Sequence, residues 1–402
     1  MGTLAVPDLA RLARSTTQAA AMAERGEVSK VAADAFVKLV DRHGRYVDDL
    51  STRLLRAHSD GRIGNPQEAA AALSAARAAL DEAQQVLTSG TTTRQRVPFL
   101  KFLGTRSDAS AGVAALRSAA DELTLADTRI RAIPNTAVVD EASSAYVLRG
   151  DELGAVRGAA HQATDPADLT AGTRELLTFD RGKQSRISSV YDATVGRLFA
   201  TRWHGADKIA DGQHQTLGTL YLGSHMRIVD PMELIAGLRV RGAEPMRALG
   251  NNGVVRDFPI LQRVGLFGIT NKVGDEVVKA EELIPTLLDQ GTSTLMFQDG
   301  TLVPLINGAV GEPRRGAALA ASRTGAPIVH TATYGLQSKV DIGPLAAGRR
   351  PQTVVGDPLW IRRAEPGSSA EALDEQVYEV TELIAQRHER LQGEAFRRYA
   401  DQ

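Results

Sequence analysis

The sequence predicts a two-part chain, with an all-α helical bundle over residues 1–170 and an α/β domain over residues 171–402. The first part is rich in Ala, Leu, Arg, Glu and Asp. Gly and Pro residues interrupt it at intervals, as is typical of helices that are joined by turns. From about Trp203, short apolar runs alternate with helical stretches. Strands joined by crossover helices form mixed, largely parallel sheets flanked by helices, so the predicted fold class is α/β.

The helices of the first part are indicated by the spacing of apolar residues. Over residues 28–58 the larger apolar side chains recur at steps of three and four, which gives one buried stripe. Residues 67–87 are nearly continuous in Ala, and small side chains allow helices to pack closely. We therefore expect an antiparallel bundle over residues 8–164, and a further helical segment over residues 175–200 that leads into the next domain.

Short apolar runs bounded by turn residues predict the strands of the second part. These runs lie at residues 216–222, 264–270, 293–297, 326–331 and 353–361. Helical periodicity predicts helices at residues 232–240, 276–290, 315–324 and 371–391. His388 lies on the apolar stripe of the last helix, where we expect a partly buried structural histidine. Ligands bind beyond the carboxyl ends of strands in such sheets, so the residues after each strand are candidates for a site.

Composition and charge narrow the classes of function. The 402 residues include no cysteine, which excludes disulfides, thiolate catalysis and Cys-ligated metal and is typical of a reducing compartment. The formal net charge of -1 gives no overall field that would attract nucleic acid. No apolar run approaches the roughly 20 residues of a membrane span, and the N-terminus lacks the layout of a signal peptide. We expect a cytoplasmic protein whose membrane contact is peripheral, at the inner face.

His225 and Asp230 are the most informative pair of residues. They lie between a predicted strand and a helix start at Asp230-Pro231, where Asp caps the helix and Pro takes its first position. A histidine accepts a proton at neutral pH, and a carboxylate on its other nitrogen fixes the tautomer and stabilises the imidazolium. The pair therefore fits a general base with its orienting acid. The alternative is an ordinary helix cap beside a loop histidine.

Three further segments follow this pair along the chain. They are Gly265-Leu-Phe-Gly-Ile-Thr-Asn271, then Phe297-Gln-Asp-Gly-Thr301 with Pro313-Arg-Arg-Gly-Ala317 after it, and Ala326-Pro-Ile-Val329. Together with His-x4-Asp at residues 225–230, their order and spacing resemble the glycerolipid acyltransferase superfamily, which contains lysophosphatidate and glycerol-3-phosphate acyltransferases. The resemblance extends over residues 202–361 and does not cover the N-terminal half.

The resemblance implies transfer of a fatty acyl group from acyl-CoA or acyl-carrier protein to a hydroxyl acceptor. A glycerol phosphate or a lysophospholipid would be the acceptor, and no cofactor is implied. His225 would be the general base and Asp230 its orienter. A thioester is already activated, so no protein nucleophile is needed, and the sequence holds no Gly-x-Ser-x-Gly elbow.

The later segments imply residues that bind the substrate. Asp299, Gly300 and Thr301 would contact the ligand at a strand end, where the alternative is an ordinary Asp-Gly turn. Arg314 and Arg315 open a predicted helix and would bind a phosphate or carboxylate through their forked donors. The alternative for these two arginines is a solvated helix start.

The chain departs from the family at two arginines that are linked to binding the phosphate of the acceptor. Asn271 stands where the first is usual, with Lys272 beside it, and Leu302 stands where the second is usual. Lys272 and Arg227 are the candidates for supplying the missing charge, and for Arg227 the alternative is a surface arginine. The departures leave the identity of the acceptor open.

Residues 94–106 combine aromatic side chains with four cations in a predicted loop between helices. Such a loop would meet an anionic membrane or an acidic carrier protein. The alternative is a loop whose Phe99 and Phe102 pack on the bundle.

Two other functions of the chain also stay open. One is a lipid-binding interaction protein that has an acyltransferase-like domain but no turnover, and the other is a hydrolase such as a thioesterase.

Overall fold

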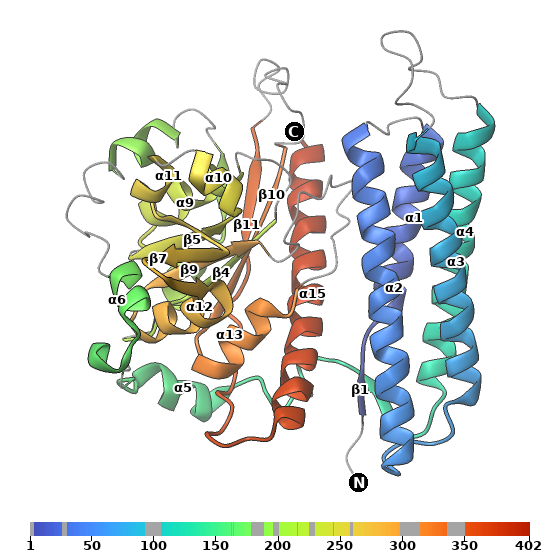
Figure 1. Cartoon of the computed structure of the whole chain (residues 1–402), viewed down its shortest axis with the longest axis horizontal. Helices are drawn as coiled ribbons and strands as arrows, with labels where there is room; N and C mark the ends of the chain where they lie inside the picture. Colours follow the sequence, from blue (N-terminus) through green and yellow to red (C-terminus); the bar gives the residue numbers. More distant parts are fainter. Residues whose placement is uncertain are drawn as a thin grey trace. The chain divides into compact units, whose positions relative to one another are not determined.

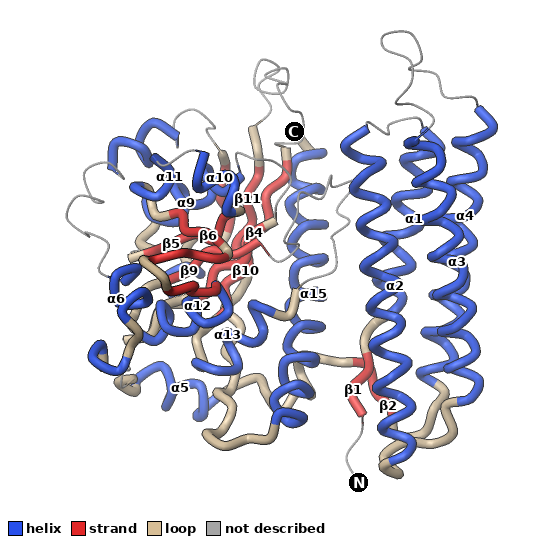
Figure 2. The backbone as a smooth tube through the Cα atoms, in the orientation of Figure 1, coloured by secondary structure: helices blue, strands red, loops and turns tan. Residues whose placement is uncertain are grey.

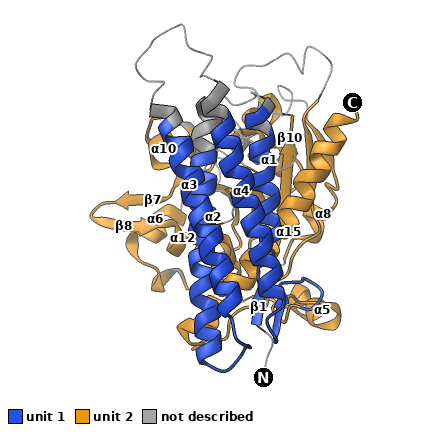
Figure 3. Cartoon of the chain, turned by 90° about the vertical axis from the view of Figure 1, so that its right-hand side faces the viewer, with its two compact units in different colours: residues 1–143, 303–312 blue, residues 144–302, 313–402 orange. Residues whose placement is uncertain are grey.

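The computed structural model divides into two compact units, shown in different colours in Figure 3. The structure describes residues 4–25, 30–92, 106–161, 163, 165–177, 189–195, 201–214, 216–224, 230–243, 245–257, 260–297, 314–335 and 350–402. Described residues up to Ser143 belong to the first unit, and those from Ser144 onward belong to the second.

Four long helices make up most of the first unit, and they run side by side in Figure 1. The unit contains β1 (Leu4–Val6), α1 (Leu9–Arg25), α2 (Lys30–Ser59), α3 (Gln67–Thr92), α4 (Arg106–Arg131) and β2 (Thr136–Val138). Helix α4 packs against α1 and α3, and α3 packs against α2. Ala76 and Ala83 of α3 and Ala119 of α4 are buried in the core, where their small side chains allow the close approach expected from the alanine-rich sequence. The predicted N-terminal helical region is confirmed.

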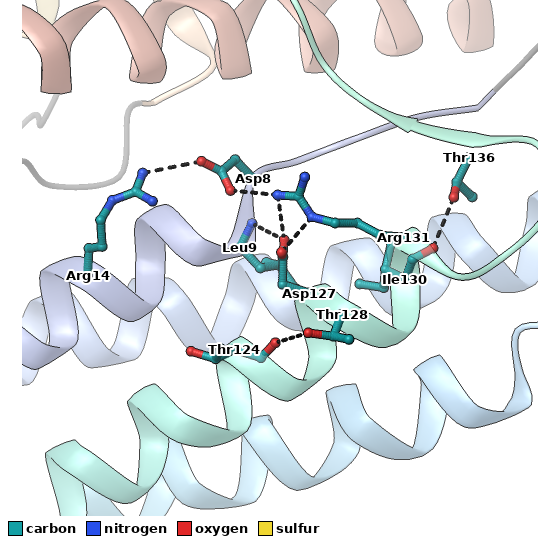
Figure 4. Close-up of polar contacts among 9 residues, drawn as sticks. All are labelled: Asp8, Leu9, Arg14, Thr124, Asp127, Thr128, Ile130, Arg131 and Thr136. Carbon is teal, nitrogen blue, oxygen red and sulfur yellow. Dashed lines mark hydrogen bonds and ion pairs between the residues drawn. The ribbon is translucent and has the colours of Figure 1, made fainter.

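Polar contacts fix the start of α1 (Figure 4). Asp127 of α4 is buried, and its Oδ1 accepts a hydrogen bond from the backbone N–H of Leu9 at 3.1 Å. Arg131 donates to Asp127 Oδ2 at 2.6 Å and to Asp8 Oδ1 at 3.0 Å. The first N–H groups of a helix have no partner within that helix, so a carboxylate of α4 supplies a cap for α1.

A histidine lies inside the bundle among hydroxyl groups. His43 of α2 is fully buried, with its Nε2 3.4 Å from Ser15 Oγ and its Nδ1 3.3 Å from Thr16 Oγ1, both on α1. Burial, together with the charges of Arg11 and Arg42, lowers the pKa of His43 to about 3. The imidazole is therefore neutral at physiological pH and joins α1 to α2 through polar contacts.

A seven-stranded mixed sheet forms the centre of the second unit (Figure 2). In spatial order its strands are β3 (Arg202–His204), β11 (Gln352–Val355), β10 (Ile328–Tyr334), β4 (Leu220–Gly223), β9 (Ser293–Phe297), β5 (Met246–Gly250) and β6 (Leu266–Gly268). The five strands from β10 to β6 are parallel, and β11 runs antiparallel to β10. The predicted mixed, largely parallel sheet is confirmed. We call the edge of the sheet where these five strands end the carboxyl edge.

Helices flank this sheet on both faces. On one face α15 (Ala370–Ala400) packs on β10 and β11, and α13 (Gly316–Thr324) lies between α15 and α12 (Ala280–Asp289). On the other face α9 (Asp230–Val240) shares a core cluster with Val329 of β10. Ala332 of β10 packs against α15 instead, as the alternation of side chains along a strand requires.

The remaining elements of the second unit are short. They are α5 (Gly150–Gly158), the 3-10 helix η2 (Pro166–Asp168), α6 (Ala171–Leu177), α8 (Lys208–Asp211), α10 (Asn252–Asp257), α11 (Ile260–Arg263), and the antiparallel hairpin of β7 (Thr270–Val273) and β8 (Glu276–Lys279). No helix among the described residues is long and apolar enough to cross a membrane.

The observed boundary between the units precedes the one predicted after residue 170. Residues that follow Ser143 join the α/β unit because Val147 forms a β-bridge with Ile361. In addition, the N–H of Leu148 donates to the carbonyl oxygen of Trp360 at 2.9 Å. This segment therefore adds backbone pairing to the second unit.

Several predicted elements differ from those observed. The helix predicted from residue 276 begins at Ala280, because residues 276–279 form β8 of the hairpin. Strand β5 was not predicted, since Arg247 interrupts its apolar run, although this arginine is buried in the structure. Within the predicted helix over 175–200, the structure describes helical residues at the end of α6 and over 189–195.

Candidate active site

The connection from β4 to α9 carries the predicted base. Strand β4 ends at Gly223 and α9 begins at Asp230, so the predicted strand and helix do flank the His-x4-Asp segment. Residues 225–229, with His225 and Arg227, lie outside the described residues, as does the side chain of Asp230. His225 follows Gly223 by two residues in the sequence.

The next strand in the sheet, β9, carries the predicted substrate-binding residues. Gly223 of β4 lies opposite Phe297, the last residue of β9. Asp299 follows Phe297 by two residues, as His225 follows Gly223, although residues 298–313 lie outside the described part of the chain. Neighbouring strands are about 4.8 Å apart, so the segments with His225 and Asp299 start from adjacent points on the carboxyl edge. Gly300 and Thr301 belong to the second of these segments.

Close packing explains the glycine at the end of β4. A Cβ atom on Gly223 would lie 2.7 Å from Leu234 Cδ1 of α9 and 3.0 Å from the ring of Phe297. Both distances are too short for a side chain without a shift of its neighbours. The end of β4, the end of β9 and the first turns of α9 are thus packed together.

The two predicted arginines after β9 have different surroundings. Arg315 precedes the first residue of α13, donates to Asp374 Oδ1 of α15 at 2.9 Å, and lies 5.8 Å from the ring centre of Tyr378. This ion pair offsets the unfavourable position of a cation at a helix N-terminus. Arg314 is exposed. Of the two, Arg314 has the environment expected of a residue that meets an external anion.

Lys272 lies away from these strand ends. It is exposed on β7, beyond β6, and two strands separate β6 from β4. Three strand spacings amount to about 14 Å. Asn271 accepts a hydrogen bond from the Gly268 N–H at 3.2 Å and donates to the Gly268 carbonyl at 3.0 Å. Asn271 therefore shapes the turn after β6.

Two asparagines that the sequence interpretation did not single out follow β5 at the same carboxyl edge. Asn251 Oδ1 accepts from the Gly253 N–H at 2.8 Å, and Asn252 Oδ1 accepts from the Thr270 N–H at 3.0 Å. They were missed because β5 itself was not predicted. The adjacent pair Asn251-Asn252 after a short run was the available signal. Asn251 thus caps the start of α10, and Asn252 joins α10 to the start of β7.

A different histidine and carboxylate meet at the opposite edge of the sheet, where the parallel strands begin. His161 Nε2 contacts Asp289 Oδ1 at the end of α12. The backbone N–H of His161 donates to Thr216 Oγ1 at 2.7 Å. Thr216 and Asp289 precede β4 and β9 respectively. This pair has the residue types of a general base and its orienter, and it lies at the edge of the sheet where β4 begins.

Two further histidines are buried between β10 and α15. His330 and His388 are both fully buried. Burial lowers the pKa of His388 to about 3, and it also lowers the pKa of His330 well below its ordinary value. His388 was predicted to be partly buried, whereas its burial in the structure is complete.

No protein-family model matches the chain, and comparison with curated proteins gives no match. Among the described residues, no group of three or more His, Asp or Glu side chains is arranged to hold a metal ion.

Proposed function

We propose that the chain is an acyltransferase that moves a fatty acyl group from acyl-CoA or acyl-carrier protein to a hydroxyl acceptor, with His225 as general base. A glycerol phosphate or a lysophospholipid is the proposed acceptor. The observation that carries the proposal is the register of β4 and β9. Because Gly223 lies opposite Phe297, the segments with His225 and Asp299 leave adjacent strands at one edge. In parallel sheets this edge is where ligands bind.

In the proposed reaction, His225 removes the proton of the acceptor hydroxyl as its oxygen attacks the thioester carbonyl. The carbon–sulfur bond then breaks, and the proton passes from the imidazolium to the departing thiolate. Asp230 holds the tautomer of His225 and stabilises the imidazolium. General-base catalysis of this kind contributes roughly 10²- to 10⁴-fold.

The chemistry does not require a nucleophile from the protein, and Ser224 is unsuited to be one. Ser224 is buried, and its Oγ already accepts a hydrogen bond from the Thr333 N–H at 3.1 Å. The hydroxyl group beside His225 is therefore occupied with the backbone of β10, and the acceptor of the reaction must come from the substrate.

For the substrate we propose that Asp299, Gly300 and Thr301 line the ligand and that Arg314 binds its anionic group. Arg227 is the second proposed cation, because it belongs to the His-x4-Asp segment itself. Arg315 and Lys272 are weaker candidates, since Arg315 is paired with Asp374 and Lys272 follows the outermost strand.

A lipid-binding protein without turnover is the second candidate function. Asn271 binds the backbone of Gly268 where the family has an arginine, and Arg315 is engaged with α15. A site with fewer cations would hold an acyl chain without orienting a phosphate acceptor for attack. A thioesterase is the third candidate, because the same base would activate water.

One assay separates these functions. The purified chain is incubated with acyl-CoAs of several lengths, with and without a panel of hydroxyl acceptors, and the released thiol is measured with a thiol reagent. The chain contains no cysteine, so the reagent reports the released CoA alone. Thiol release that requires an acceptor supports acyl transfer, and release without an acceptor indicates a thioesterase. Acyl-CoA binding without release indicates the lipid-binding alternative.

His161→Ala is the matched control for His225→Ala. His161 also contacts a carboxylate, but at the opposite edge of the sheet. Acceptor-dependent release should disappear in His225→Ala and persist in His161→Ala. The reverse result would reject His225 as the base.

We also propose that the chain is cytoplasmic and works at the inner face of a membrane, which residues 94–106 would contact through their cations and aromatic side chains. Residues 94–105 lie outside the described part of the chain, and Arg106 is the first residue of α4. Sedimentation with anionic and neutral vesicles tests the proposal. Binding that is specific for anionic vesicles and lost in Phe99→Ser/Phe102→Ser would support it, and equal sedimentation with both would reject it.

A further inference from the structure

A buried polar network surrounds Thr333 near the end of β10. Its N–H donates to Ser224 Oγ at 3.1 Å, and its carbonyl oxygen accepts from Gln392 Nε2 of α15 at 3.3 Å. Its hydroxyl lies 2.8 Å from Thr353 Oγ1 of β11. All four residues are buried. Three elements of the second unit thus hold one residue, through its N–H, its carbonyl and its side chain.

The bond to Ser224 replaces a bond of the sheet. In the register of the two parallel strands, Thr331 lies opposite Gly223, and Thr331 Oγ1 also donates to the Leu222 carbonyl at 3.1 Å. Along a strand, every second backbone amide faces the same neighbouring strand. After Thr331, the next amide of β10 that faces β4 is therefore that of Thr333. A continuing ladder would offer it a backbone carbonyl, but here it meets a side-chain hydroxyl. The chain can therefore leave the sheet after Gly223 without an unpaired buried N–H.

Polar side chains in such a position are costly unless each has its partner. Apolar residues would fill the same space between β10, β11 and α15 with no such requirement. What the network provides is a fixed direction for the backbone at Ser224, the residue directly before His225. An error of about 1 Å in the position of a reacting group costs on the order of 100-fold in rate.

We propose that Ser224 is a positioning residue for the base of the reaction, and that Thr333, with Thr353 and Gln392, holds it in place. This inference rests on the proposed function of His225. Ser224 does not touch substrate in this account. It acts by fixing the backbone from which His225 extends.

The test compares Ser224→Ala with Ser322→Ala. Ser322 is a fully buried serine on α13, outside the network. Ser224→Ala should lower kcat about 10- to 100-fold, with KM little changed, because substrate contacts remain while the base is displaced. The acidic limb of the pH profile of kcat/KM, which reports the ionisation of the base, should shift in Ser224→Ala and stay in place in Ser322→Ala.

Two more variants separate positioning from stability. Ser224→Thr keeps the hydroxyl and should restore most of the kcat and the original pH profile. Thr353→Val removes one support of Thr333 and should lower kcat less than Ser224→Ala. Its control is Thr381→Val, a buried threonine of α15 whose Oγ1 donates to the Val377 carbonyl within the same helix.

The outcomes are distinguishable. A loss of kcat in Ser224→Ala that only matches its unfolded fraction, with an unchanged pH profile, overturns the positioning role while the proposed function stands. Full activity in His225→Ala overturns the proposed function, and with it any role of Ser224 in orienting that residue. Absence of acyl transfer by the unaltered chain does the same.

Discussion

The two units use buried polar groups in different ways. In the helical bundle, Asp127 and His43 lie along helices, and their partners are a helix N-terminus and the hydroxyls of a neighbouring helix. In the α/β unit, the polar groups around Thr333 gather where strands end, next to the segment that we assign to the base. A buried polar group between helices fixes how the helices pack, whereas one at a strand end fixes where the chain goes next.

The largest effect that separates the units concerns catalysis. His225→Ala should lower kcat/KM roughly 10²- to 10⁴-fold, because the acceptor hydroxyl loses its base. His43→Gln, in the bundle, should leave kcat per folded molecule unchanged. Steady-state kinetics with an acyl-CoA and an acceptor measure both. Equal losses in the two variants would show that catalysis is not confined to the α/β unit.

Acid should weaken both units through their buried histidines. The pKa of His43 and that of His388 are each lowered to about 3, so unfolding takes up one proton per histidine at any pH between about 3 and 6.5. Each histidine contributes stability that is full above about pH 6.5 and falls by about 1.4 kcal/mol per pH unit below it. The pKa of buried His330 is also lowered, so this histidine further reduces the stability of the second unit as the pH falls.

Urea unfolding between pH 7 and pH 4.5 can follow the units separately. Both tryptophans, Trp203 and Trp360, lie in the second unit, so their fluorescence reports that unit, while the far-ultraviolet circular dichroism also reports the bundle. His388→Leu should reduce the pH dependence of the fluorescence transition, and His43→Leu should not. An unchanged pH dependence in both variants would contradict neutral buried imidazoles.

A smaller effect is expected from the cap of α1. Asp127→Ala removes the acceptor of the Leu9 N–H and the partner of Arg131, and should cost about 1–3 kcal/mol in the free energy of unfolding. Asp121→Ala, at an exposed position of the same helix, is the control and should change stability by less than about 0.5 kcal/mol. The lower free energy of unfolding should appear in the unfolding transition that circular dichroism follows. A shift only in the transition that tryptophan fluorescence follows would contradict a cap that acts within the bundle.

The smallest effect is expected at Arg315. Its ion pair with Asp374 is about half exposed, so Arg315→Ala should cost only about 0.2–1 kcal/mol in stability. If Arg314 is the residue that binds the anionic group, Arg314→Ala should raise the KM for the acceptor while Arg315→Ala leaves it nearly unchanged. A larger rise of KM in Arg315→Ala would reverse the assignment of the two arginines.

The parts of the fold that the sequence predicted are those with a clear period or clear ends. The run Ser293–Phe297 was placed correctly because a short apolar run bounded by turn residues has the length of a strand and is too short for a typical helix. Arg247 hid β5, since the burial of an arginine depends on partners that are distant in the sequence. The hairpin of β7 and β8 was hidden by its short strands, which resemble the first turn of a helix in composition.

For the candidate site, the sequence supplied residue types and their order, and the structure supplied the register. The relation of Gly223 to Phe297 depends on which strands become neighbours, and β4 and β9 are separated in the chain by β5 to β8. The ion pair of Arg315 with Asp374 likewise joins residues that are distant in sequence. Local patterns carry no information on either pairing.

The cap of α1 also constrains the order in which the bundle can form. The N–H of Leu9 is bound by Asp127, and the residues of β1 pair with residues 136–138, so both contacts join the start of this unit to its end. A ribosome releases the chain from the N-terminus, and neither contact can form until residues beyond 127 have emerged. The cap of α1 and the pairing of β1 therefore form only after α4 has been made, and closing this long loop carries an entropic cost.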